Sequence, residues 1–163
     1  MKRRLILSAS VLALGTIAVF PTVASASPTS GTEHIQITTV NSNPGAVLAR
    51  GVFTASGIDY PKGKNTDLFV FSDGAFTVRH MVSSQTFTLN PKTCLAKGAL
   101  AGSYTLKAGV GGYQGITGSG TFKGLETFVL PRNANGTCDE KNSAQPLSSV
   151  TRISASGPIS FKP

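Results

Sequence analysis

The chain has 163 residues, of which 15 are lysine or arginine and 7 are aspartate or glutamate, for a formal net charge of +8. Beyond residues 2–4 the basic residues are scattered singly, and no nucleic-acid-binding motif accompanies them. A nucleic-acid binder would gather basic residues on one face, so we expect no nucleic-acid partner.

The N-terminus predicts a secretory signal peptide over residues 1–26. Residues 2–4 are basic, residues 5–20 are mostly apolar, and Ala24-Ser25-Ala26 supplies the small side chains that signal peptidase requires. The apolar run is shorter than the roughly 20 residues that cross a membrane as a helix. We therefore expect cleavage after Ala26 and a secreted mature chain without a transmembrane segment.

The exported chain is expected to begin with a short polar leader, 27–32, followed by a single domain, 33–163. Within that domain apolar and polar residues alternate over short runs, which is the two-residue period of a half-buried strand. No long run has the spacing of an amphipathic helix. In chain order, the expected strands are 34–40, 47–55 with a bend at Gly51, 67–72, 75–81, 85–89, 103–107, 121–130, and one or two strands over 149–161. The expected loops are 57–65, a glycine-dense stretch over 109–120, and 131–147.

About eight short strands with frequent turn signals predict an all-β fold, either an antiparallel barrel or a β-sandwich. We favour a single antiparallel β-barrel, because glycines at 51, 115, 118 and 120 would let the strands curl. The β-sandwich is the alternative.

Both cysteines, Cys94 and Cys138, fall in the expected domain. An exported protein meets an oxidising environment, so this even pair predicts one disulfide. The two thiols lack the spacing and the neighbouring histidine ligands of a metal site.

The segment TDLFVFSDGAFTVRHM, residues 66–81, gives the one strand register that can be derived. A two-residue type I′ turn at Asp73-Gly74 would reverse the chain. Counting outward from that turn places Phe71 opposite Phe76 and Asp67 opposite His80. Opposed residues share a face, and a slip of one residue would move the whole set to the other face.

The face that carries the phenylalanines must be buried, so the derived register directs Asp67 and His80 into the interior, at the end of the hairpin away from its turn. An acid–imidazole pair at the mouth of an apolar barrel is a place where the polar group of a ligand would dock. The alternative is a cross-strand salt bridge at a solvated rim. The candidate ligand-binding residues are Asp67, His80, Phe69, Phe71, Phe76, Tyr104 and Tyr113, with core packing as the alternative for the two tyrosines.

The motifs of established chemistry are missing from the sequence. No nucleophile elbow occurs, and the two histidines, His34 and His80, have no metal-binding spacing. The glycine run over 109–120 departs from the dinucleotide-binding spacing and precedes no helix. We therefore predict no catalytic residue, no metal and no cofactor.

Residues 94–124 resemble a pattern found in small secreted proteins of actinobacteria. The pattern runs Cys, then Gly-x-Tyr-x-Leu, then Gly-x-Gly-x-Tyr-x-Gly-Ile-x-Gly-x-Gly-x-Phe, and is met here with one irregular step at Gly112. The matching residues are Gly102, Tyr104, Leu106, Gly109, Gly111, Tyr113, Gly115, Ile116, Gly118, Gly120 and Phe122. The glycine-rich strand pair is also similar to that of dirigent and allene oxide cyclase-like barrels. This resemblance implies an eight-stranded antiparallel barrel with a hydrophobic cavity. The catalytic residues of allene oxide cyclases match no positions here, so the resemblance implies no enzymatic role.

Three functions follow from these observations. The preferred one is a secreted, non-catalytic barrel that binds a small apolar or amphipathic ligand in its interior, oriented by Asp67 and His80. The second is a cyclase- or isomerase-like enzyme that uses the same cavity, with His80 as general base and Asp67 orienting it. The third is a structural or adhesion module of the cell envelope.

Overall fold

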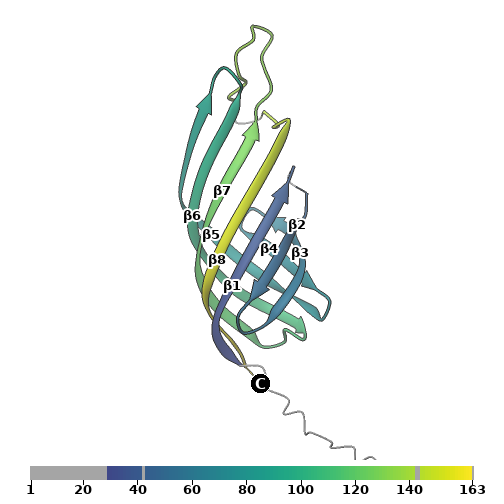
Figure 1. The fold of residues 1–163 in the computed structure, drawn as a ribbon. Coiled ribbons are helices and arrows are strands. Elements are labelled where there is room, and N and C mark those ends of the chain that lie inside the picture. Colours follow the sequence, from purple (N-terminus) through teal and green to yellow (C-terminus); the bar gives the residue numbers. More distant parts are fainter. Residues whose placement is uncertain (1–28, 42, 142–143, 163) are drawn as a thin grey trace, which may run out of the picture.

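The computed structural model describes residues 29–41, 43–141 and 144–162, and the expected signal peptide lies outside them. The described chain forms a closed barrel of eight antiparallel strands, in which each strand pairs with its neighbours in sequence and the last pairs with the first (Figure 1). The all-β barrel expected from the sequence is therefore confirmed, and the β-sandwich is excluded. Among the described residues there is no helix with the length and apolar character needed to span a membrane.

The eight strands differ widely in length, from 6 residues in β2 and β4 to 17 in β5 and β6. Their bounds are β1 (Ser30–Val40), β2 (Gly45–Arg50), β3 (Thr54–Gly63), β4 (Thr66–Phe71), β5 (Gly74–Asn90), β6 (Leu95–Gly111), β7 (Ile116–Val129) and β8 (Ser148–Phe161).

Several expected boundaries are wrong. The expected strands 75–81 and 85–89 are one continuous strand, β5, and the stretch 109–120, expected as a loop, contributes to β6 and β7. Residues 57–65, expected as a loop, lie mostly within β3, which tolerates Pro61 because the pairing with β4 is irregular between Pro61 and Gly63. Gly51, expected in the middle of a strand, lies in the turn between β2 and β3. In addition, β1 already begins at Ser30, so half of the expected leader is strand.

The β4–β5 hairpin turns one residue earlier than expected. Phe71 pairs with Gly74 and Phe69 with Phe76, so Ser72 and Asp73 form the turn. Neither turn residue has a positive φ, as a type I′ turn would require, whereas Gly74 has a φ of 149°. A side chain at Gly74 would also collide with the carbonyl oxygen of Val110 on β6. Gly74 is therefore required for the close pairing of β5 with β6 and not for the geometry of the turn.

This correction shifts every β4–β5 partner by two residues, which is one full period of a strand. Each residue of β4 and β5 therefore lies on the face that was expected, although its cross-strand partner is a different residue. Asp67 pairs with Val78 rather than with His80. Beyond Arg79, β5 continues without a β4 partner, apart from the hydrogen bond that the His80 amide donates to the Asn65 carbonyl at 3.1 Å.

One end of the barrel is filled by aromatic rings, and we call this set the aromatic cluster. Tyr113 lies at its centre, with ring centroids 5.0 Å from Phe53, 5.1 Å from Phe71 and 5.3 Å from Phe76. The members of the aromatic cluster are Phe53, Phe69, Phe71, Phe76, Tyr113 and Phe161. Burying these rings stabilises the folded protein by more than their buried area alone would, because each edge-to-face pair adds roughly 0.5–1.5 kcal/mol to the stability.

At the opposite end, strands β5 to β8 rise past the shorter strands as a four-stranded extension (Figure 1). The disulfide between Cys94 and Cys138 is present, as expected, with a Cα–Cα distance of 5.4 Å. It joins the turn before β6 to the loop between β7 and β8. The Arg132 guanidinium reinforces this junction by donating to the Lys92 carbonyl at 2.6 Å.

The disulfide should contribute measurably to stability. It spans a sequence separation of 44 residues, and the chain-entropy model assigns such a loop about 4 kcal/mol. We expect a Cys94→Ser/Cys138→Ser variant to unfold at a lower urea concentration than the oxidised protein, with reductant shifting only the wild type. Equal midpoints for the variant and the oxidised wild type would contradict a stabilising role.

Candidate functional site

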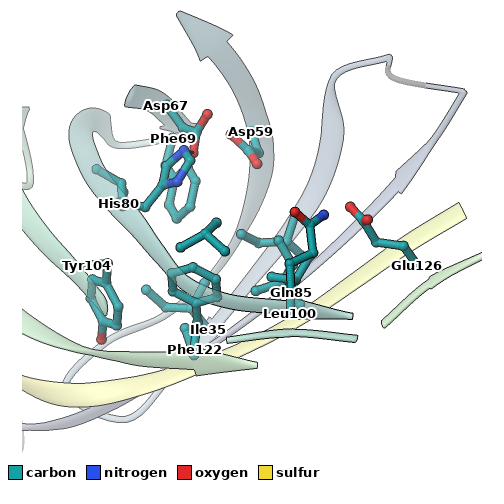
Figure 2. Close-up of a pocket in the computed structure, with 15 residues that line it drawn as sticks. Ile35, Asp59, Asp67, Phe69, His80, Gln85, Leu100, Tyr104, Phe122 and Glu126 are labelled. Carbon is teal, nitrogen blue, oxygen red and sulfur yellow. Dashed lines mark ion pairs between the residues drawn. The ribbon is translucent and has the colours of Figure 1, made fainter. Parts of the chain in front are cut away.

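Above the aromatic cluster the barrel interior holds a cavity of about 240 Å³, which opens to solvent near the exposed residues Val82 and Gln85. Most of its wall is apolar, and seven of the eight strands contribute to it. The apolar lining residues are Ile35, Ile37, Phe69, Val78, Val82, Leu100, Phe122, Ile153 and Ala155, and the polar ones are Asp59, Asp67, His80, Gln85, Tyr104 and Glu126. Figure 2 shows Asp59, Asp67 and His80 close to one another, with Gln85, Leu100 and Glu126 as a separate group.

Asp67 and His80 form an ion pair in the wall of this cavity. The distance between His80 Nε2 and Asp67 Oδ2 is 3.2 Å, and the two side chains are 25% and 18% exposed. They meet diagonally across β4 and β5, since Asp67 is paired with Val78, two residues before His80. Burial raises the pKa of Asp67, and the neighbouring His80 partly opposes that rise.

The other expected ligand-binding residues divide into two groups. Phe69 and Tyr104 line the cavity. Phe71, Phe76 and Tyr113 do not line it, because they lie nearer the turns and pack against one another in the aromatic cluster. The expectation that one aromatic surface would face a ligand therefore needs correction, since most of these rings fill the closed end of the barrel.

Asp59, which is not among the residues expected to bind a ligand, also lies in the cavity wall. Its side chain comes from β3, and Asp59 pairs with Phe69 on β4, two residues from Asp67. It is only 7% exposed, and its Oδ1 atom has no hydrogen-bond partner among the described residues. Burial, together with repulsion from Asp67, raises its pKa to about 7. Asp59 falls within residues 57–65, which were expected to form a loop, so no inward direction was predicted for its side chain. It does, however, alternate with Ile58 and Tyr60 as a strand requires.

A second buried polar group lies deeper in the barrel. Glu33 is fully buried, and its Oε2 accepts a hydrogen bond from the Phe53 amide at 3.2 Å. Burial raises the Glu33 pKa, while backbone amides of the β2–β3 turn oppose that rise. Burial, and then the charge of Glu33, raises the pKa of Tyr104.

The glycine-rich part of β7 explains how Tyr104 reaches this region. Tyr104 pairs with Gly120, and a Cβ atom at Gly120 would lie 2.8 Å from the tyrosine ring. A larger residue there would push the ring away from the sheet. Gly120 therefore fixes the direction of Tyr104, whose hydroxyl has no hydrogen-bond partner among the described residues.

Within the part of the chain that the structure describes, no group of three or more acidic, histidine or cysteine side chains has an arrangement suited to a metal ion. No family model, curated protein or solved structure matches this chain. The arrangement of the cavity must therefore be interpreted from its own residues.

The raised pKa of Asp59 predicts a pH-dependent stability. Between its ordinary value of 3.8 and about 7, the folded protein holds this proton while the unfolded chain has released it. The free energy of unfolding therefore falls as the pH rises through this window. We expect Asp59→Asn to reduce that fall by up to about 1.4 kcal/mol per pH unit, measured by urea denaturation from pH 4 to pH 8.

Asp73→Asn is the matched control, because Asp73 lies exposed in the β4–β5 turn. Its pH profile should follow that of the wild type. Parallel profiles for Asp59→Asn and the wild type would show that the Asp59 carboxyl titrates alike in the folded and unfolded states.

Proposed function

We propose that this protein binds one small amphipathic molecule in its interior without transforming it. The observation that supports this proposal is the division of the barrel into a filled end and a hollow end. Eight strands enclose an interior that side chains can just fill or that can hold one small ligand. Here the aromatic cluster occupies one half, and a cavity of about 240 Å³ occupies the other.

The lining of the cavity favours an amphipathic ligand over a wholly apolar one. Its wall is mainly apolar, but it also carries the Asp67–His80 ion pair and the buried carboxyl of Asp59. Ligand sites of this kind use a few convergent polar groups to orient a molecule that apolar contacts hold. The polar end of the ligand would therefore lie against β3, β4 and β5.

The inner face of the extension continues this apolar surface beyond the cavity. Phe87 lies two residues from the cavity-lining Gln85, and its ring covers Gly98 on β6. Phe87 is 49% exposed, and its ring centroid is 5.6 Å from that of Phe128 on β7. A ligand with a chain longer than the cavity could lay its free end along these rings.

We infer that this binding takes place outside the cytoplasm. The disulfide between Cys94 and Cys138 supports this inference, since such bonds persist in oxidising compartments. Kinship with dirigent and allene oxide cyclase-like barrels is part of the same proposal. Its support is the eight-stranded antiparallel architecture and the glycine-rich pairing of β6 with β7.

A cyclase- or isomerase-like enzyme is the second candidate, and the Asp67–His80 ion pair favours it. A carboxylate that holds one imidazole nitrogen can prepare the other to act as a general base. With Nε2 facing Asp67, Nδ1 is the atom left for a substrate. A bound molecule recovered chemically altered, and unaltered after incubation with His80→Ala, would establish this enzyme and overturn the non-catalytic proposal.

Filling the cavity should abolish binding. Ala155 lines the cavity on β8, so Ala155→Phe would place a ring where the ligand lies. We expect the affinity for an environment-sensitive hydrophobic dye to fall at least about tenfold, which corresponds to roughly 1.4 kcal/mol. Dye titration followed by fluorescence measures this effect, and native mass spectrometry of freshly isolated protein tests for a retained molecule.

Ala46→Phe is the matched control, since Ala46 is an exposed residue of β2 and adds the same ring outside the barrel. It should leave dye binding unchanged. If the wild type binds no dye and repeatedly carries no small molecule, the binding proposal fails.

A further inference from the structure

The charges of this protein are segregated between the cavity and the rest of the chain. The chain is basic overall, yet three of its seven carboxylates line the cavity, namely Asp59, Asp67 and Glu126. None of the lysines and arginines that the structure describes lines it. The one cavity residue able to carry a positive charge is His80, and it already pairs with Asp67. The cavity is thus an acidic site inside a basic protein.

Asp59 is the most buried carboxyl of the cavity wall, with only 7% of the residue exposed. Among the described residues, its Oδ1 has no hydrogen-bond partner. A second carboxylate, Asp67, lies diagonally across the β3–β4 pairing, two residues from Phe69, which is the partner of Asp59. Buried polar atoms are nearly always hydrogen-bonded, so the buried carboxyl of Asp59, in the wall of the cavity, lacks the compensation that such groups normally have.

We propose that the polar end of the bound molecule is a cationic nitrogen, an ammonium or amidinium group, held between Asp59 and Asp67. This inference rests on the proposed binding function and names the chemical class of the ligand. A cationic N–H group in the cavity beside these two residues would offset the repulsion between their carboxylates. Charge-assisted hydrogen bonds of this kind are about twice as strong as neutral ones.

The other amphipathic classes fit this site less well. A carboxylate or phosphate head group would add a third negative charge beside Asp59 and Asp67, and none of the described lysines and arginines lines the cavity to meet it. A neutral hydroxyl can donate one hydrogen bond but leaves the charge of ionised Asp59 uncompensated in an apolar wall. An apolar chain that ends in an amine matches both the wall and the polar side of the cavity.

The pH dependence of binding has a definite sign. The titratable groups that share the cavity with Asp59 are Asp67 on β4, His80 on β5, Tyr104 on β6 and Glu126 on β7. A cation binds best when the carboxylates are ionised. Burial raises the pKa of Asp59 to about 7, so its protonation weakens cation binding as the pH falls, whereas a ligand that accepts a hydrogen bond from protonated Asp59 would show the opposite trend.

Three probes with the same alkyl chain test the inference, namely decylammonium, decanol and decanoate, measured by displacement of a bound dye. We expect decylammonium to bind at least about tenfold more tightly than decanol, with decanoate the weakest. Lowering the pH from 8 to 6 should weaken decylammonium binding and leave decanol binding unchanged. Asp59→Asn should weaken decylammonium binding about tenfold and change decanol binding little.

The controls separate this inference from the proposal on which it rests. Asp73→Asn, in the exposed turn, should match the wild type for all three probes. Asp67→Asn, which removes the other carboxylate of the proposed site, should also weaken decylammonium binding and gives a second test if Asp59→Asn does not fold. Equal affinities for decylammonium and decanol, or no effect of either cavity variant, would overturn the cation preference while leaving the binding function intact. If none of the three probes displaces the dye, the binding function fails and the cation preference fails with it.

Discussion

Pairing between β1 and β8 closes the sheet, and the interior of the molecule depends on this closure. The pairing runs from Ser30 opposite Ser160 to Val40 opposite Val150, along the whole length of β1. A closed antiparallel sheet has no long free edges around its circumference, and its strand alternation sends every second side chain inward. The size of the side chains at these positions then decides whether the interior is solid or hollow at each level.

The two ends of the barrel show both results. Around Tyr113, aromatic rings from four different chain segments meet and leave no room. One layer away from the turns, the inward residues include Ala155, Val78 and the isoleucines of β1, which are too small to meet across the interior. The change in side-chain size along the strands therefore accounts for the cavity.

Sequence reasoning predicted the faces of the strands better than their partners. The β4–β5 turn was placed one residue too late, but the resulting shift of two residues preserved the strand alternation, so Asp67 and His80 do lie together in the interior. The position of Asp59, in contrast, could not be predicted from the sequence. Asp59 occupies an inward position of β3, where a half-buried strand normally carries an apolar residue, so the alternation with Ile58 and Tyr60 does not identify its buried face. The residues that make a site polar are thus the ones that hide its strand from pattern analysis, and only the three-dimensional pairing of β3 with β4 reveals them.

Among the described residues, Oδ1 of Asp59 has no hydrogen-bond partner, which raises the question of why an aspartate occupies this position. A carboxyl group 7% exposed in an apolar wall opposes folding once it ionises, and its pKa of about 7 expresses that opposition. An apolar residue of similar size would stabilise the same position, because removing an unbonded buried polar group relieves its desolvation penalty. Asp67 differs, since His80 compensates its charge within the protein. The ion pair between Asp67 and His80 can be explained as a structural contact without a ligand. Asp59 has no such explanation, so it is the residue that most favours a binding function for the cavity.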